Sequence, residues 1–260
     1  TRYEVDPTQL QSRIEALGAI GRGADGGIYR LVYTPVWQAA RDLVESWMRD
    51  GGLETWIDAA GNLIGRLEGT EPGPVIMTGS HIDAVPCGGA YDGALGVHAS
   101  LAAALALKAA HGQPRRSIDV VAICDEEGSR FRSDFLGARA ITGELTPGEL
   151  EQLVDADGVT ASDAMRGVGL DPARVAEARR DDVAAWLELH IEQGGTLEAD
   201  GINLGVVHTI TGHRIIRVTI EGRQDHAGTT PMDIRRDPMQ AAAAIVTAAT
   251  GLATSMGRPS

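Results

Sequence analysis

Three apolar runs each end in titratable side chains, and this arrangement most limits how the chain can fold. The runs are "PVIMTGSHI" at 74–82, "SIDVVAICDEEG" at 117–128 and "VAAWLELHIEQGG" at 183–195. Unbroken apolar runs are typical of strands in a parallel sheet, and the Ala- and Leu-rich segment 94–110 predicts a helix between the first two. Because open α/β sheets bind ligands outside the carboxyl ends of their strands, we expect the three polar ends to meet in one crevice.

Helix and hairpin patterns ahead of these runs predict an α/β fold with a mixed sheet flanked by helices. Thr34 and Pro35 suit the N-cap and first position of a helix, and apolar residues recur at helical spacing as far as Trp47. Residues 53–69 predict two short strands around a Gly-Asn turn. The segment "GSHIDAVPCGGAYDG" at 79–93 is too rich in glycine for a helix or a strand, so we expect a loop there.

The pattern changes near residue 203, which predicts a second domain. Residues 203–222 alternate as strands do, and Asp237 begins an Ala-rich helix. A length of 260 residues fits one large domain, or one domain with part of another. We predict a first domain over 1–209, incomplete at its C-terminal side, and the beginning of a smaller α+β domain over 210–260.

The charge balance disfavours several classes of partner. The chain has 36 acidic and 23 basic residues, a formal net charge of -13, which disfavours nucleic acid and anionic membranes. The longest apolar stretch is broken by His98, Ser100 and Lys108, so we expect no membrane-spanning helix, and the N-terminal residues lack a secretory signal. Cys87 and Cys124 have no CxxC spacing, which indicates a reducing, cytoplasmic compartment.

The polar strand ends and the loop after the first strand carry donors that suit a transition metal: His81, Asp92, Glu127 and His190. This mix of imidazole and carboxylate fits Zn²⁺ and, less selectively, Mn²⁺, Co²⁺ or Ni²⁺. Three donors would hold one ion, whereas four, with a carboxylate able to bridge, fit two ions that share a water. Each residue taken singly is more often a solvated strand end or turn than a ligand. Their delivery to the same edge of the sheet favours a metal site, but spacing alone leaves both interpretations open.

Further carboxylates beside these donors have the chemistry of supporting groups. Asp83 follows His81 by two residues on the same side of an extended segment, where it can accept the other ring N–H and fix the tautomer. Glu126 and Glu127 are neighbours and point in different directions. One of them can therefore bind metal while the other takes a proton from water.

Four long motifs give the chain a family resemblance. In order they are "GSHIDAVPCGGAYDGALGV", "DEEGSRF", "ELHIEQG" and "DHAGTTPMDIRRD". From about Tyr29 to its last residue the chain resembles the amidase, hydantoinase and carbamoylase group of the two-metal aminopeptidase-like hydrolases. That group contains allantoate amidohydrolases, N-carbamoyl-L-amino acid hydrolases and β-ureidopropionases. The resemblance implies a two-zinc aminopeptidase-like catalytic domain followed by a smaller dimerisation or lid domain.

The resemblance also implies roles for the motif residues around the metals. His81 and His190 would hold one ion and Glu127 the other, and Asp92 would bridge them. Glu126 would be the general base. Asp83 would orient His81.

On the substrate side, the resemblance implies that Gln193 and His226 face the substrate. His226 would reach across from the small domain of a partner subunit, which implies a homodimer. Ala84 stands where the family usually has Thr. A further His ligand, and the Asn and Arg that bind the substrate carboxylate, are expected beyond Ser260.

The implied reaction is hydrolysis of the ureido C–N bond of a small carboxylic acid, releasing ammonia and carbon dioxide. Allantoate and an N-carbamoyl-L-amino acid are the expected substrates. The expected cofactors are two divalent ions, most favourably zinc, with manganese, cobalt or nickel as alternatives. Three alternatives remain open: hydrolysis of N-carbamoyl-β-alanine, a dipeptidase or aminoacylase on the same metal site, and an inactive truncated fragment. His208 and His213 are interpreted as strand residues.

Overall fold

The computed structural model describes residues 3–133, 135–210, 212 and 215–257. The chain divides into two compact units, Thr1–Asp200 and Gly201–Ser260. The predicted domain boundary between residues 209 and 210 stays a prediction. His213 lies outside the described residues.

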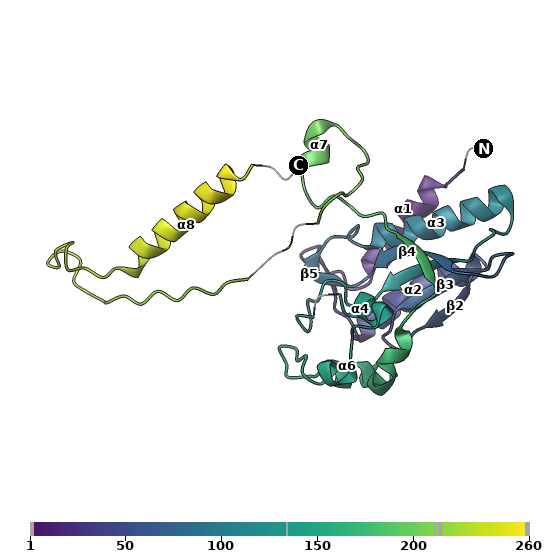
Figure 1. Cartoon of the computed structure of the whole chain (residues 1–260), viewed down its shortest axis with the longest axis horizontal. Helices are drawn as coiled ribbons and strands as arrows, with labels where there is room; N and C mark the ends of the chain where they lie inside the picture. The colour runs from purple at the N-terminus through teal and green to yellow at the C-terminus, as the bar shows by residue number, and fades with distance from the viewer. Residues whose placement is uncertain (1–2, 134, 211, 213–214, 258–260) are drawn as a thin grey trace. The chain divides into compact units, whose positions relative to one another are not determined.

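A five-stranded mixed sheet forms the centre of the first unit (Figure 1). Its strands lie in the order β2 (Glu54–Ile57), β3 (Leu63–Leu67), β6 (Ile118–Ile123), β4 (Val75–His81) and β7 (Val183–Leu187). β4 is parallel to both β6 and β7, whereas β3 pairs antiparallel with both β2 and β6. The predicted mixed sheet and hairpin are confirmed. Because the three apolar runs are adjacent parallel strands, their polar ends lie at one edge of the sheet.

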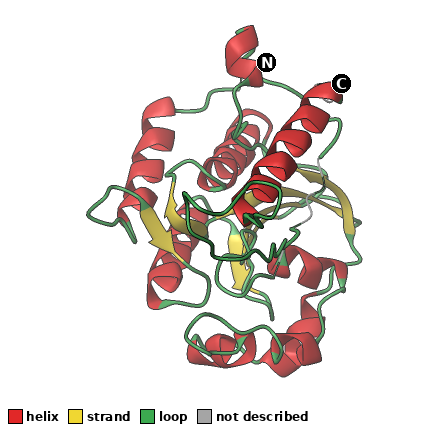
Figure 2. Cartoon of the chain, turned by 90° about the vertical axis from the view of Figure 1, so that its left-hand side faces the viewer, coloured by secondary structure: helices red, strands yellow, loops and turns green. Residues whose placement is uncertain are grey.

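Helices of the first unit lie around this sheet (Figure 2), and the residues of β6 alternate between two layers. Val120 and Ala122 belong to the large core that also contains residues of α2 (Pro35–Asp50) and α3 (Ala94–His111). Val121 and Ile123 belong to a second cluster, with Ala138 and Ile141 of α4 (Leu136–Thr142) packed against it. This period of two is that of a strand buried on both faces. The other helical elements of the unit are α1 (Pro7–Ala19), α5 (Pro147–Leu150), α6 (Ala161–Gly167), the 3-10 helix η1 (Pro172–Ala178) and α7 (Thr196–Asp200).

Two helices begin where the sequence predicts. Thr34 Oγ1 accepts a hydrogen bond from the backbone N–H of Trp37 at 3.2 Å at the start of α2. In the second unit, Asp237 Oδ1 accepts from the N–H of Met239 at 2.9 Å at the start of α8 (Pro238–Ser255). Both contacts satisfy backbone donors that the first helical turn leaves unpaired.

Helix α3 is the one helix among the described residues with the length and hydropathy of a membrane span. Its residues Val97 and Leu101 are fully buried in the large core, and the helix packs against β4. Because a core helix has the same composition, this feature is weak evidence for a membrane.

The expectation of a plain loop over residues 79–93 is wrong in part. Ala84–Gly88 forms β5, which pairs antiparallel with β1 (Ile28–Arg30). The Arg30 side chain, fully buried, donates hydrogen bonds to the carbonyl oxygens of Ile82 at 2.5 Å and Leu17 at 3.0 Å. The strand therefore depends on a segment more than fifty residues earlier in the sequence, which local glycine content does not reveal.

The strands predicted over 203–222 are absent from the part of that segment that the structure describes. Ile215 and Val218 are exposed there. A strand is stable when it pairs with a neighbour and buries one face, and the described residues of the second unit provide neither.

Candidate metal centre

Donor side chains from three adjacent strands meet at one edge of the sheet. His81 ends β4, Glu126 and Glu127 follow β6, and His190 follows β7. Asp92 reaches the same place from the turn before α3. Ligand atoms lie within 4.8 Å of one another in two groups, His81 with Asp92 and His190, and His81 with Glu126 and Glu127. The structure thus brings the four predicted ligands and the predicted base together.

Both imidazole rings present Nε2 to the centre of this cluster. His81 Nδ1 lies 3.0 Å from the carbonyl oxygen of Asp83, and His190 Nδ1 lies 2.9 Å from the carbonyl oxygen of Ile191. A carbonyl oxygen only accepts hydrogen bonds, so in the neutral ring the proton sits on Nδ1. Nε2 then carries a free lone pair, which is the state in which histidine binds metal.

Asp92 Oδ1 faces these two lone pairs. It lies 3.3 Å from His190 Nε2 and 3.9 Å from His81 Nε2. The atom is buried and has no hydrogen-bond partner among the described residues. Two neutral imidazole nitrogens and a carboxylate oxygen are all acceptors, so they cannot satisfy one another. A cation between them would satisfy all three, and their chemistry matches a transition-metal site.

The glutamates add negative charge to the same cluster. Glu126 Oε2 lies 3.6 Å from His81 Nε2. Burial, with smaller contributions from nearby acids, raises the pKa of Glu127 to about 7 and also raises the pKa of Glu126. Burial lowers the pKa of His81, but Asp83, Glu126 and Glu127 outweigh it, so the pKa is raised. The raised pKa values of the two glutamates and of His81 all mean that added positive charge stabilises the cluster.

Gly93 is required by the close packing of this loop. It adopts φ +63°, and a Cβ at this position would collide with the ring of His81. Only glycine adopts this backbone geometry at little cost and also leaves room for the imidazole. Gly93 therefore lets Asp92 return to His81 at the start of α3.

The profile of the Peptidase family M20/M25/M40 matches residues 77–259, a span that contains every candidate ligand. The chain belongs to this family. It is 46% identical over 241 residues to the N-carbamoyl-L-amino acid amidohydrolase of Geobacillus stearothermophilus, which covers 92% of this chain and 59% of the relative. It is 45% identical over 234 residues to the allantoate amidohydrolase of Bacillus subtilis strain 168, which covers 90% of this chain and 57% of the relative.

Solved structures agree with this placement in the M20/M25/M40 family. A hydantoinase/carbamoylase family amidase from Burkholderia ambifaria superposes with a TM-score of 0.83 at 30% identity, over 99% of this chain and 63% of that one. The chain therefore spans less than two thirds of the length of these relatives. The family is one of metal-dependent hydrolases, and the resemblance drawn from the motifs is confirmed.

Asp83 contacts both His81 and the Glu126–Glu127 pair of the candidate metal centre. Its carboxylate accepts hydrogen bonds from the backbone N–H groups of Glu126 at 3.2 Å and Glu127 at 3.1 Å. Its carbonyl oxygen, not its carboxylate, is nearest to His81 Nδ1, since Oδ1 lies 3.6 Å away. The geometry thus differs from the carboxylate contact expected from sequence, while the residue still holds His81 in place.

Gln193 borders the cluster and contacts Asp92. Its Nε2 donates to Asp92 Oδ2 at 2.9 Å. The residue has φ +52°, which is unusual outside glycine and often occurs at functional sites. The amide is therefore held against the candidate ligand Asp92, with its carbonyl oxygen left as an acceptor.

His226 lies in the second unit, where a tight turn fixes its tautomer. Its Nδ1 accepts from the backbone N–H groups of Gly228 at 3.0 Å and Thr229 at 3.2 Å. In the neutral ring the proton is then on Nε2. Arg235 Nη2 closes the turn by donating to the carbonyl oxygens of His226, Ala227 and Thr230 at 3.0, 3.1 and 2.9 Å.

Sequence reasoning missed Ser80 and Glu188. Ser80 Oγ donates to Glu188 Oε1 at 2.6 Å, which ties the end of β4 to the end of β7 just before the two histidines. The negative charge of Glu188 also contributes to raising the pKa of Glu126. The available clue was that Glu188 is a further carboxylate in the motif "ELHIEQG", two residues before His190.

Proposed function

We propose that the protein is a metal-dependent amidohydrolase that cleaves the ureido C–N bond of a small carboxylic acid. The proposed substrates are allantoate or an N-carbamoyl-L-amino acid, and the products include ammonia and carbon dioxide. The observation that carries this proposal is the buried Asp92 Oδ1, which faces the Nε2 atoms of His81 and His190 and has no hydrogen-bond partner among the described residues. The names of the relatives supply the substrate class.

In this proposal His81, His190 and Asp92 hold one divalent ion, and Asp92 and Glu127 hold a second. Zinc is favoured by the imidazole and carboxylate donors, with manganese, cobalt or nickel as alternatives. Bound there, such ions supply polarisation of a carbonyl oxygen and a lowered pKa for water in the site. Asp83 positions the ligands through its contacts to His81 and to the Glu126–Glu127 backbone.

Glu126 acts as the proton carrier. It removes a proton from the attacking water as the water oxygen bonds to the ureido carbon, and it returns that proton to the leaving nitrogen as the C–N bond breaks and ammonia departs. The carbamate that remains then takes up a proton on its nitrogen and loses carbon dioxide as the second C–N bond breaks. Its side chain lies at the centre of the donor cluster, 3.6 Å from His81 Nε2. Burial raises its pKa, which brings the carboxylate closer to the range of an effective base at neutral pH.

Gln193 and His226 bind and polarise the substrate. The free carbonyl oxygen of Gln193 accepts from a ureido N–H, and the Nε2–H of His226 donates to the oxyanion that develops on the carbonyl oxygen. A ureido carbonyl is a weak electrophile because two nitrogens donate into it, so this donation is needed. The tautomer fixed by Gly228 and Thr229 supports the role of His226.

The active form is a homodimer assembled through the second unit, in which His226 serves the partner subunit. Exposed apolar side chains on α8, among them Met239, Val246 and Leu252, support an interface there. The two free cysteines, Cys87 and Cys124, support a reducing, cytoplasmic location.

Substitution of Glu126 by Gln in the full-length protein tests the mechanism. Turnover should fall by about 10²- to 10⁴-fold while the metal content is kept, because Gln cannot carry the proton. Allantoate, N-carbamoyl-L-amino acids, N-carbamoyl-β-alanine, a dipeptide and an N-acetyl amino acid should be assayed side by side for product release. Near-native turnover in Glu126→Gln would rule out the base, and hydrolysis of only the last two substrates would rule out the ureido assignment.

A further inference from the structure

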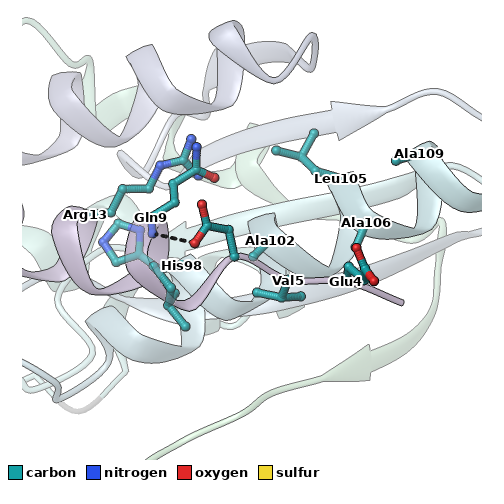
Figure 3. Close-up of a pocket in the computed structure, with 11 residues that line it drawn as sticks. Glu4, Val5, Gln9, Arg13, His98, Ala102, Leu105, Ala106 and Ala109 are labelled. Carbon is teal, nitrogen blue, oxygen red and sulfur yellow. Dashed lines mark hydrogen bonds between the residues drawn. The ribbon is translucent and has the colours of Figure 1, made fainter. Parts of the chain in front are cut away.

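A cavity of about 220 Å³ lies between the chain's N-terminal segment, α1 and α3, apart from the metal ligands (Figure 3). None of the candidate ligands lines it. Its volume corresponds to about seven water-sized groups, because one water occupies roughly 30 Å³ of liquid. A ligand of about six to eight non-hydrogen atoms would fill it.

His98 brings unpaired polar atoms to this cavity. The residue is 0% exposed, and neither ring nitrogen has a hydrogen-bond partner among the described residues. One face is occupied by Trp47, whose ring lies edge-on with its centroid 5.1 Å away. Burial, and then the charges of Arg13 and Arg30, lower the pKa of His98 to about 4. The neutral ring therefore offers one donor and one acceptor that neither protein nor solvent satisfies.

Arg13 adds a cation at the same end, and the negative charge of Asp50 compensates it only in part. Figure 3 shows its side chain close to Gln9 and His98, away from Leu105 and Ala109. The guanidinium lies 5.7 Å from the ring of Trp47, and no acceptor forms a hydrogen bond with it within the part of the chain that the structure describes. A guanidinium with free donors is suited to a carboxylate, which it binds through two parallel hydrogen bonds.

The rest of the cavity is apolar with an acidic border. Ala102, Leu105 and Ala106 of α3 line its length, and Glu4 lies at the end opposite Arg13 (Figure 3). Asp6 also lines it, with Oδ1 accepting from the N–H groups of Thr8 and Gln9. A free anion would be repelled by the acids and a free cation by Arg13. A molecule carrying both charges and a short apolar part would match all three regions.

We propose that this cavity binds a small aliphatic amino acid as its zwitterion. The carboxylate pairs with Arg13 and accepts the ring N–H of His98, the ammonium group points toward Glu4 and Asp6, and the carbon chain lies on Ala102 and Leu105. Because the His98 ring is covered, the long side chains of Gln9 or Arg13 rotate when the ligand enters. The site does not depend on the proposed amidohydrolase activity.

Calorimetric titration of the full-length protein, stripped of metal, tests the proposal. Glycine, L-alanine, L-valine and β-alanine are compared with propionate and propylamine, which carry one charge each. At least one amino acid should bind saturably and about tenfold more tightly than either single-charge analogue, since a lost charge-assisted contact weakens binding roughly tenfold or more. The comparison of L-alanine with β-alanine separates α- from ω-amino acids.

Variants locate the binding. Arg13→Gln and Glu4→Gln change partly or fully exposed residues and should weaken binding about tenfold, whereas Arg115→Gln, an exposed arginine paired with Glu71, should not. The ring ¹⁵N shifts of His98 should change on titration. No saturable binding, equal binding of propionate, unchanged affinity in Arg13→Gln, or unchanged His98 shifts would each overturn the proposal. A co-crystal that shows only water in the cavity would overturn it as well.

Discussion

Oδ1 of Asp92 lies 3.3 Å from Nε2 of His190, although neither atom has a hydrogen to share when the ring is neutral with its proton on Nδ1. The same oxygen faces Nε2 of His81 at 3.9 Å. Acceptors that converge in a buried place without donors are a costly arrangement unless a cation joins them. The proposed metal centre is therefore supported by the way these acceptor atoms converge, and not only by the presence of residue types that bind metal.

Asp83→Asn should weaken metal binding by about 10- to 100-fold, the range for groups that orient metal ligands. An amide keeps one oxygen acceptor, so one of the two contacts to the backbone of Glu126 and Glu127 is lost. Competition with a chromophoric chelator measures the change. Asp157→Asn, at an exposed loop position, is the control, and an equal loss of affinity there would contradict the role of Asp83.

Gly93→Ala and Gly112→Ala separate backbone strain from damage to the metal centre. The two glycines flank α3 at φ +63° and +76°, so backbone strain alone should cost each substitution about 1–3 kcal/mol of stability. At Gly112 a Cβ meets no atom within 4 Å, whereas at Gly93 it meets the ring of His81. Only Gly93→Ala should also reduce metal affinity, by at least tenfold. Equal metal affinity in the two variants would contradict the packing argument.

His98 should make stability depend on pH on the acid side. Its pKa is about 4 in the folded chain and about 6.5 when exposed, so the unfolded state binds more protons between these values. Stability is then complete above pH 6.5 and falls as the pH drops toward 4, by about 3 kcal/mol. Denaturant unfolding of the native protein and of His98→Phe at several pH values measures this. The free energy of unfolding of the native protein should fall relative to that of His98→Phe as the pH drops from 6.5 toward 4. A difference in unfolding free energy that does not change with pH would contradict the lowered pKa of His98.

Arg235→Gln should lower kcat/KM by about 10- to 100-fold, because it frees the turn that fixes His226. Arg236→Gln, the neighbouring exposed arginine, is the matched control. Ring ¹⁵N shifts of His226 report the tautomer independently of activity. If Arg235→Gln keeps both the native tautomer and native kinetics, Arg235 does not position His226.

Much of the candidate metal centre could be predicted because local apolar runs in the sequence indicate the parallel strands. The apolar runs before His81, Glu126 and His190 are adjacent parallel strands, and this adjacency brings the candidate ligands at the strand ends together, whereas Asp92 comes from the turn before α3. The contacts of Arg30 to Leu17 and Ile82 could not be foreseen, because they join segments distant in sequence. The same holds for the tie between Ser80 and Glu188.

The strands expected over 203–222 failed for a related reason. Alternation of apolar residues gives a segment the capacity to form a strand, but a paired neighbour decides whether the strand forms. In the described part of this segment no such pairing exists. The start of α8 was predictable, since Asp237 supplies its cap from within the same turn.

The metal content of Asp92→Asn tests the central claim most directly. The native protein and the variant are equilibrated with zinc or manganese and gel-filtered, bound metal is measured by plasma mass spectrometry, and ammonia release from allantoate and N-carbamoyl-L-amino acids is followed in the same samples. The native protein should retain bound metal and release ammonia. The variant should bind metal at least about 100-fold more weakly, because groups that only orient ligands already contribute 10- to 100-fold. Equal metal content and equal turnover in the two proteins would contradict the role of Asp92 as a ligand.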